Sequence, residues 1–145
     1  MPAARGSTSL GLKAIPKVER AVHAVALYLA DHKELKVDQA EAHLLAHLHG
    51  ARAARVGDLH AEFGHRRSTL TSVLDRLEQR GLITRAVDRS DRRSITVRLT
   101  KAGSTLASKV FEVLSKYEAS ALKGFSVKEI AAFQKVLEAF SSIRG

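Results

Sequence analysis

Arginine is the residue type best suited to chemistry in this chain, and it is concentrated in the central third. Residues 55–101 hold eleven Lys and Arg, nearly all Arg, against six Asp and Glu, whereas the flanking segments each carry an excess of only two positive charges. A guanidinium group binds phosphate or a guanine edge through two parallel hydrogen bonds, which lysine cannot do. The net charge of +9 over 145 residues favours polyanionic partners without specifying a fold. The uneven distribution predicts that the central segment forms a polyanion-binding surface.

The segment that must position many of these arginines is Leu77–Gly103. Leu82–Val87 is expected to form a strand, and the alternation of apolar and polar residues over 95–99 predicts a second one. The loop between them, Asp88–Arg93, contains three arginines. The pattern predicts a two-stranded ribbon with a cationic tip.

Two helices joined at a glycine are expected in front of this ribbon. The first covers Val56–Phe63 and the second covers Arg67–Arg80. Gly64 between them permits the turn and the close approach of the helices, and Gly81 supplies the left-handed residue that ends the second helix. A helical pair followed by a basic ribbon is the layout of a winged helix-turn-helix, which places one helix in a DNA groove and a basic loop beside it.

Further helices are predicted on both sides of this segment. Apolar residues recur at three- and four-residue spacing from about Pro16, and Asp38 with Glu41 has capping-box spacing before a helix that ends near Gly50. Thr100 is expected to cap the helix that follows the ribbon. A second capping box, at residues 126–129, precedes the last helix.

The expected fold class is mainly α with a small antiparallel β-wing. Residues 1–12 are predicted to be a mobile N-terminal arm, residues 38–103 a winged helix-turn-helix domain, and residues 13–37 and 104–145 a helical dimerisation region. The first helix and the last two carry long apolar stripes that a short winged domain cannot cover. We therefore expect them to pack together and against a second copy of the chain. A homodimer also suits a pseudo-palindromic DNA site, because it presents two recognition helices one turn apart.

The central residues resemble the MarR family of bacterial winged-helix transcription regulators. The likeness is carried by Ser68–Thr71, Asp75–Glu78 and Gly81–Arg85, and most strongly by Asp91-Arg92-Arg93, which is followed after five residues by Leu99-Thr100 and then by Gly103. Over the rest of residues 15–143 only the order of the helices and their stripes match. The resemblance implies a dimer joined through its terminal helices that represses transcription until a small molecule or an oxidant releases it from DNA.

The resemblance also assigns the DNA-binding residues. The helix that begins near Arg66 would be the recognition helix in the major groove, and the wing arginines would approach the minor groove. The predicted DNA contacts lie off the apolar face of that helix and in the wing: Arg66, Arg67, Ser68, Thr71, Ser72, Arg76, Arg89, Arg92 and Arg93. Asp91 is expected to bridge to a wing arginine and to hold the shape of the loop. Arg80 and Arg85 are left open between DNA contacts and structural ion pairs, and His65 is expected to contact phosphate or cap the helix.

Seven histidines raise the question of a metal site. His43 and His47 are four residues apart on one predicted helix, a spacing that can chelate zinc. Some MarR-like regulators sense zinc, so a zinc-responsive regulator of the same fold is one alternative. Both residues lie off the predicted apolar stripe, and His23, His32 or Glu41 could complete the site only if the fold brings them near. We therefore expect exposed polar positions here, and no cofactor.

Other function classes are disfavoured by what the chain lacks. It has no cysteine, which excludes disulfides, thiolate metal sites and thiol-based peroxide sensing. It also lacks a Gly-rich phosphate loop and any recognisable catalytic set, so we do not expect an enzyme.

A winged-helix protein-interaction or architectural DNA-binding module is the second alternative, although an apolar or acidic wing would suit a protein partner better. No apolar run approaches the ~20 residues of a membrane span, so a soluble cytoplasmic protein is expected. The effector stays open among aromatic acids, other small molecules, metals and none.

Overall fold

The computed structural model of the chain describes residues 11–64 and 66–144, and it divides into two units, residues 1–40 and 41–145. In the first unit, helix α2 (Ile15–Asp31) is followed by the short 3-10 helix η1 (Lys33–Leu35). Pro16 stands in the first turn of α2, where its missing N–H is not needed. Most of the predicted mobile arm, residues 1–10, and His65 lie outside the described residues.

The second unit contains the winged region and the C-terminal helices, and it takes up all but the first two residues of α3. Its elements in chain order are α3 (Gln39–Ala51), β1 (Ala53–Arg55), α4 (Val56–Phe63), α5 (Arg67–Gln79), β2 (Ile83–Val87), β3 (Ile95–Leu99), α6 (Lys101–Leu122) and α7 (Val127–Ser142). The predicted class, mainly α with a small antiparallel sheet, is confirmed. The predicted bounds of α4 and of the hairpin agree with the structure to within one residue.

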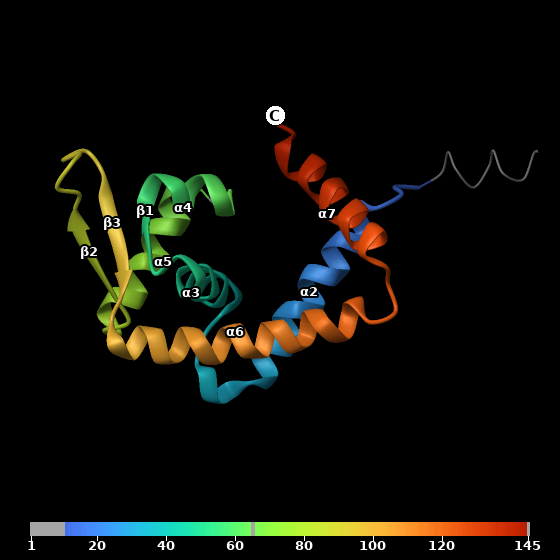
Figure 1. Cartoon of the computed structure of the whole chain (residues 1–145), viewed down its shortest axis with the longest axis horizontal. Coiled ribbons are helices and arrows are strands. Elements are labelled where there is room, and N and C mark those ends of the chain that lie inside the picture. Colours follow the sequence, from blue (N-terminus) through green and yellow to red (C-terminus); the bar gives the residue numbers. More distant parts are fainter. Residues whose placement is uncertain (1–10, 65, 145) are drawn as a thin grey trace, which may run out of the picture. The chain divides into compact units, whose positions relative to one another are not determined.

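The sheet has three strands rather than the two that the sequence predicts. All neighbours are antiparallel and the order is β1-β3-β2, so β3 lies in the middle. Strand β1 consists of Ala53, Ala54 and Arg55 only, a run too short and too small to show alternation. It begins after Arg52, whose left-handed φ of 66° turns the chain out of α3. Figure 1 shows the β2–β3 hairpin extending to a loop at one end of the sheet.

The core of the second unit is made of leucines from three helices, closed by the sheet and α6. It comprises Leu44, Leu45 and Leu48 of α3, Leu59 of α4, Leu70, Val73, Leu74 and Leu77 of α5, Ile83 and Val97 of the sheet, and Ala107 and Val110 of α6. Burial of each such leucine contributes about 1.5–3 kcal/mol. The core therefore fixes α4, α5 and the central strand as one scaffold. Within residues 11–64 and 66–144, no helix combines the length and apolarity needed to cross a bilayer.

The start of α6 is bonded to the turn that ends α5. The Thr100 hydroxyl accepts a hydrogen bond from the Gly103 main-chain N–H at 3.0 Å and donates to the Gly81 carbonyl at 2.7 Å. The Thr100 N–H donates to the Leu82 carbonyl at 3.0 Å. The predicted cap at Thr100 and the left-handed Gly81, with φ of 72°, are both confirmed. One threonine thus joins the end of the wing to the turn before it.

Helix α7 begins with the predicted capping box. The Ser126 hydroxyl accepts from the Glu129 N–H at 3.1 Å, and the Glu129 carboxylate accepts from the Ser126 N–H at 3.0 Å. These bonds lower the pKa of Glu129 below its usual value. The helix itself has no buried residue among those described, in contrast to the four on α5.

Candidate nucleic-acid interface

Helix α5 turns one face to the core and a polar face to solvent. Its four apolar residues, Leu70, Val73, Leu74 and Leu77, are buried as predicted. The other face lines a groove of about 600 Å³ formed by Arg67, Ser68, Thr71, Ser72, Asp75, Arg76 and Gln79. Arg66 is exposed and stands at the N-cap of the helix. The structure therefore places five of the six predicted recognition-helix residues around this groove, and the sixth, Arg66, at the exposed start of the helix.

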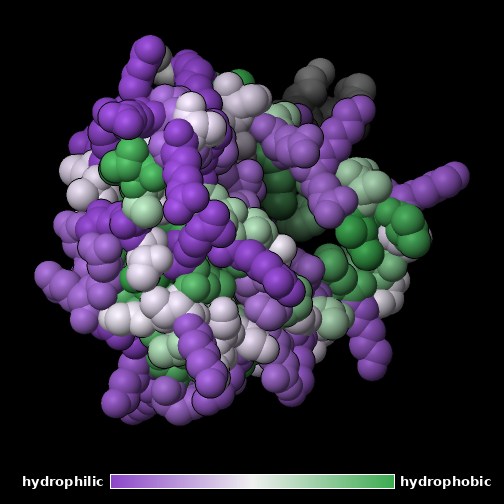
Figure 2. Space-filling view, turned by 60° about the vertical axis from the view of Figure 1, so that its left-hand side comes forward, coloured by the Kyte–Doolittle hydropathy of each residue, from purple (hydrophilic) through white to green (hydrophobic). Residues whose placement is uncertain are grey.

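A second groove joins this helix to the wing. It has a volume of about 450 Å³ and is lined by Val56, Gly57, His60, Arg67, Leu70, Thr71, Arg93, Ser94 and Ile95. Arg67 and Thr71 line both grooves, so the recognition surface continues into the base of the wing. Figure 2 brings the hairpin side of the molecule forward and shows mainly hydrophilic side chains there. The three wing arginines, Arg89, Arg92 and Arg93, are exposed as predicted.

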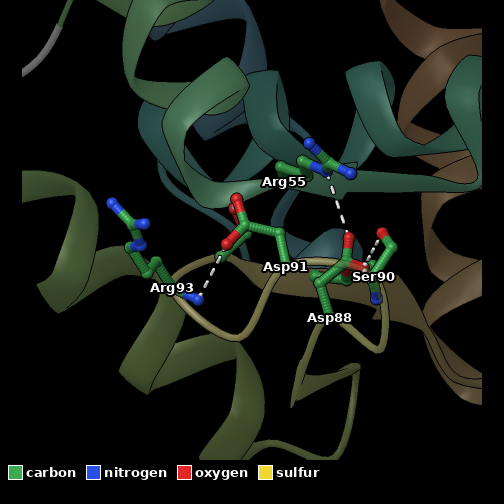
Figure 3. A network of polar contacts seen from close by, with 7 residues as sticks. Arg55, Asp88, Ser90, Asp91 and Arg93 are labelled. Carbon is green, nitrogen blue, oxygen red and sulfur yellow. Dashed lines mark hydrogen bonds and ion pairs between the residues drawn. The ribbon is translucent and has the colours of Figure 1, made fainter.

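The wing loop is closed by hydrogen bonds to two aspartates and between main-chain groups. The Asp88 N–H donates to the Ser94 carbonyl at 2.8 Å, and the Ser94 N–H donates to the Asp91 carbonyl at 2.9 Å. The Asp88 carboxylate accepts from the Ser90 main-chain N–H at 2.8 Å and from the Ser90 hydroxyl at 2.7 Å. These bonds give residues 88–94 a defined shape, from which the Arg93 side chain projects (Figure 3).

Asp91 holds the shape of the loop, as predicted, through hydrogen bonds to a main-chain N–H group and a hydroxyl group. Its carboxylate accepts from the main-chain N–H of Arg93 and from the Ser94 hydroxyl, both at 3.1 Å. The predicted bridge to a wing arginine is thus made to the main chain of Arg93, whose guanidinium points away from Asp91 (Figure 3). In a tight loop, a short aspartate side chain reaches the main-chain N–H groups of the next residues more easily than it reaches the guanidinium at the end of a long arginine side chain. Asp91 therefore binds the main chain of Arg93 and leaves the guanidinium group of Arg93 available for a contact outside the loop.

In the wing loop, the carboxylate that forms an ion pair with an arginine side chain is that of Asp88. The arginine belongs to strand β1. Arg55 Nε donates to Asp88 Oδ2 at 3.1 Å. The hydrogen bonds from the Ser90 hydroxyl and N–H, together with the charge of Arg55, lower the pKa of Asp88 from 3.8 to about 2. Sequence reasoning missed this pair. The available signal was an arginine at the N-cap of α4, where a short capping side chain is usual.

Arg80 and Arg85, which the sequence left open, are both structural ion-pair partners. Arg80 Nη1 lies 3.2 Å from Oε2 of Glu41, a buried carboxylate. Arg85 Nη2 lies 2.6 Å from Asp75 Oδ1 and 2.8 Å from Glu78 Oε1. The hydrogen bond with Arg85 lowers the pKa of Glu78, and the bonds to Glu78 and Asp75 raise the pKa of Arg85. Strand β2 is thereby tied to the recognition helix.

The histidine pair lies against an aromatic ring. His43 is exposed and His47 is half-buried, and their rings lie 6.2 Å and 5.4 Å from the ring of Phe63, measured between centroids. No group of three or more His, Cys, Asp or Glu with metal-binding geometry occurs in the described part of the chain. The pair is therefore accounted for by packing between α3 and α4.

A helical pair with an exposed polar recognition face and an arginine-tipped wing defines a winged helix-turn-helix protein. Residues 37–95 match the sequence profile of the MarR family. The HTH-type transcriptional regulator PecS of Dickeya dadantii (strain 3937) is 45% identical over 62 residues, which are 43% of this chain and 37% of that protein. The match thus spans less than two-fifths of the curated relative.

Solved structures share the fold over most of the chain. NadR in complex with 4-hydroxyphenylacetate superposes with a TM-score of 0.79 at 18% identity and covers 94% of this chain and 97% of its own. MarR from Oenococcus oeni PSU-1 gives 0.73 at 20% identity, with 88% and 94% covered. A MarR variant from E. coli complexed with operator DNA gives 0.68 at 21% identity, with 87% and 94% covered. Residues 37–95 are thus similar to the MarR family of transcription regulators, and the solved structures share the fold over most of the chain.

Proposed function

We propose that the protein is a homodimeric, sequence-specific regulator that binds a pseudo-palindromic operator. Helix α5 enters the major groove with Ser68, Thr71 and Arg76 toward the bases, and Arg89, Arg92 and Arg93 of the wing reach the minor groove. The observation that carries the proposal is the continuous surface on which Arg67 and Thr71 border both the recognition groove and the groove that contains Arg93. The complex of the E. coli MarR variant with operator DNA supports operator DNA as the partner.

The dimer proposal rests on apolar surface that the single chain leaves exposed. On α7, Phe133, Val136 and Phe140 are 53%, 51% and 41% exposed. A groove of about 520 Å³ between α6 and α7 is lined by Ala121, Leu122, Phe125, Glu129, Ile130, Ala132 and Phe133. Exposed apolar surface of this kind marks an interaction site in a folded protein. A second copy would bring two recognition helices to two half-sites.

We further propose that a small-molecule effector releases the protein from DNA, so that it acts as a repressor. NadR was crystallised with 4-hydroxyphenylacetate, which supports an aromatic acid as the first effector class to examine. The chain's lack of cysteine leaves no thiol through which an oxidant could act. A ligand screen against release of the operator, with aromatic acids first, tests this part of the proposal.

The test of DNA binding is a salt titration of operator affinity with an Arg92→Ala/Arg93→Ala variant. The operator is first obtained by selecting bound sequences from random DNA. Loss of two phosphate-neutralising groups should lower affinity by about tenfold or more and reduce the slope of log K against log[salt] by about 1.8. The matched control is Lys123→Ala/Lys128→Ala, which removes the same charge from exposed positions at the α6–α7 turn. An equal effect of both variants would reject the wing as a contact.

A further inference from the structure

Arg55 occupies a position at which a helix usually has a short polar side chain. It is the last residue of β1 and the N-cap of α4, with extended φ and ψ of −76° and 144°, and its side chain makes no capping bond. Serine, threonine, aspartate and asparagine stabilise a helix at this position by about 1 kcal/mol over residues that cannot cap. The long side chain instead reaches Asp88, 33 residues further along the chain.

The ion pair spans the tips of all three strands. Arg55 of β1 and Ala86 of β2 are both register partners of Thr96 in the central strand. The Arg55–Asp88 bond therefore passes across β3 at this residue, and the Thr96 hydroxyl donates to Asp88 Oδ2 at 3.5 Å. Because β1 is followed directly by α4, the bond connects the helix-turn-helix to the first residue of the wing loop.

The Asp88 carboxylate has two functions that use different oxygens. Oδ1 accepts both bonds from Ser90 and so shapes the loop around Arg89. Oδ2 accepts from Arg55 and so fixes where that loop stands relative to β1 and α4. The side chain of Asp88 is only 16% exposed, whereas that of Arg55 is 49% exposed. Figure 3 shows the Arg55 side chain, at the end of β1, directed toward Asp88 in the loop.

We propose that Arg55 and Asp88 are positioning residues that hold the arginine loop of the wing in register with the recognition helix. The inference rests on the proposed DNA-binding function. Arg55 acts through Asp88 on the wing, and its contribution to affinity is the placement of Arg89, Arg92 and Arg93. The competing role for an exposed arginine beside this surface is direct contact with a DNA phosphate.

The two roles predict opposite effects of Asp88→Asn. Asparagine keeps an oxygen that can accept the Ser90 bonds, loses the ion pair and makes the protein more positive by one charge. As a positioning residue, Asp88 is needed in its charged form, so both Asp88→Asn and Arg55→Ala should weaken operator binding by about two- to fivefold. The double variant should be no weaker than either single variant, because both remove one interaction. Tighter binding by Asp88→Asn, or additive losses, would overturn the proposal.

A second measurement separates this proposal from the proposed function. NMR order parameters of the backbone amides of residues 89–93, recorded without DNA, report the mobility of the loop directly. Both single variants should lower them, and Arg55→Lys, which keeps the positive charge, should lower them less than Arg55→Ala. Unchanged order parameters in both variants would reject the positioning role even if the wild type binds its operator. If the variants have lower order parameters but the wild type binds no DNA, the proposed function would be rejected, while the role of Arg55 and Asp88 in ordering the loop would stand.

Discussion

Gly103 is the residue at which the join between wing and α6 tolerates no side chain. A Cβ atom built there would lie 1.8 Å from the Leu82 carbonyl oxygen, and the Thr100 N–H already bonds that oxygen. The carbonyl cannot move away without losing this hydrogen bond. The close packing explains on physical grounds why a glycine occupies the third position of α6.

Gly103→Ala should therefore destabilise the protein, although alanine is the better helix former. We expect a loss of about 1–3 kcal/mol or more in the free energy of unfolding, since backbone must shift to admit the methyl group. Urea denaturation followed by circular dichroism measures it. The control is Gly50→Ala in α3, where no atom lies within 4 Å of the added Cβ and a gain of up to about 1 kcal/mol is expected. Equal changes in the two variants would contradict the packing argument.

Protonation of Asp88 is expected to determine the pH below which the wing loop loses its order. Its pKa of about 2 in the folded protein lies below its ordinary value of 3.8. A depressed folded pKa means that the stabilisation is fully present above about pH 4 and is lost as the pH falls toward 2. The order parameters of residues 89–93 should accordingly stay constant from pH 8 to pH 5 and decrease only below pH 4. Asp88→Asn should lack this transition, and a midpoint near pH 6 would show that another group controls the loop.

At the scale of elements, Arg85 connects strand β2 to the recognition helix. Its guanidinium lies between Asp75 and Glu78 of α5, and Asp75 belongs to the groove that faces solvent. Removal of the guanidinium would leave two negative charges on the helix that we place in the major groove. It would also release one strand of the wing from that helix.

Arg85→Ala should weaken operator binding several-fold, through repulsion between the two carboxylates and the DNA phosphates. Adding Glu78→Gln should recover part of the affinity, because it removes one of the uncompensated charges. Anisotropy titrations of the three proteins at two salt concentrations measure both effects. A double variant as weak as Arg85→Ala at both salt concentrations would assign the loss to geometry alone.

The helices and their caps could be predicted because their signals are local. Thr100 and Ser126 each cap a helix through a residue three positions away, and the stripe on α5 repeats at helical spacing. Strand β1 could not be predicted, since three residues become a strand only by pairing with β3, more than 40 residues away in sequence. The same holds for Arg55 and Asp88, whose contact depends on that pairing. The exposure of the residues on the proposed DNA-binding surface was thus predictable, and the ion pairs beside that surface were not.

At the scale of the whole molecule, α7 is the element that a single chain does not explain. The sequence predicts a stripe of Ile130, Phe133, Val136, Leu137 and Phe140, yet none of these residues is buried. An amphipathic helix of 16 residues gains most of its stability from packing of its apolar face. Its fold is therefore best understood as part of an assembly, and the proposed homodimer supplies the missing contacts.

Phe133→Glu/Phe140→Glu should convert the dimer into a monomer, because each carboxylate would have to be buried in an apolar interface. Analytical ultracentrifugation at micromolar concentration measures the mass of the wild type and the variant. The monomer should also lose most of its affinity for the full operator, while affinity for an isolated half-site changes little. The matched control is Ala131→Glu/Ser142→Glu, which adds the same charge to exposed positions on the face of α7 away from the stripe and should stay dimeric. A monomeric wild type, or a variant that sediments as a dimer, would show that the stripe on α7 has another partner.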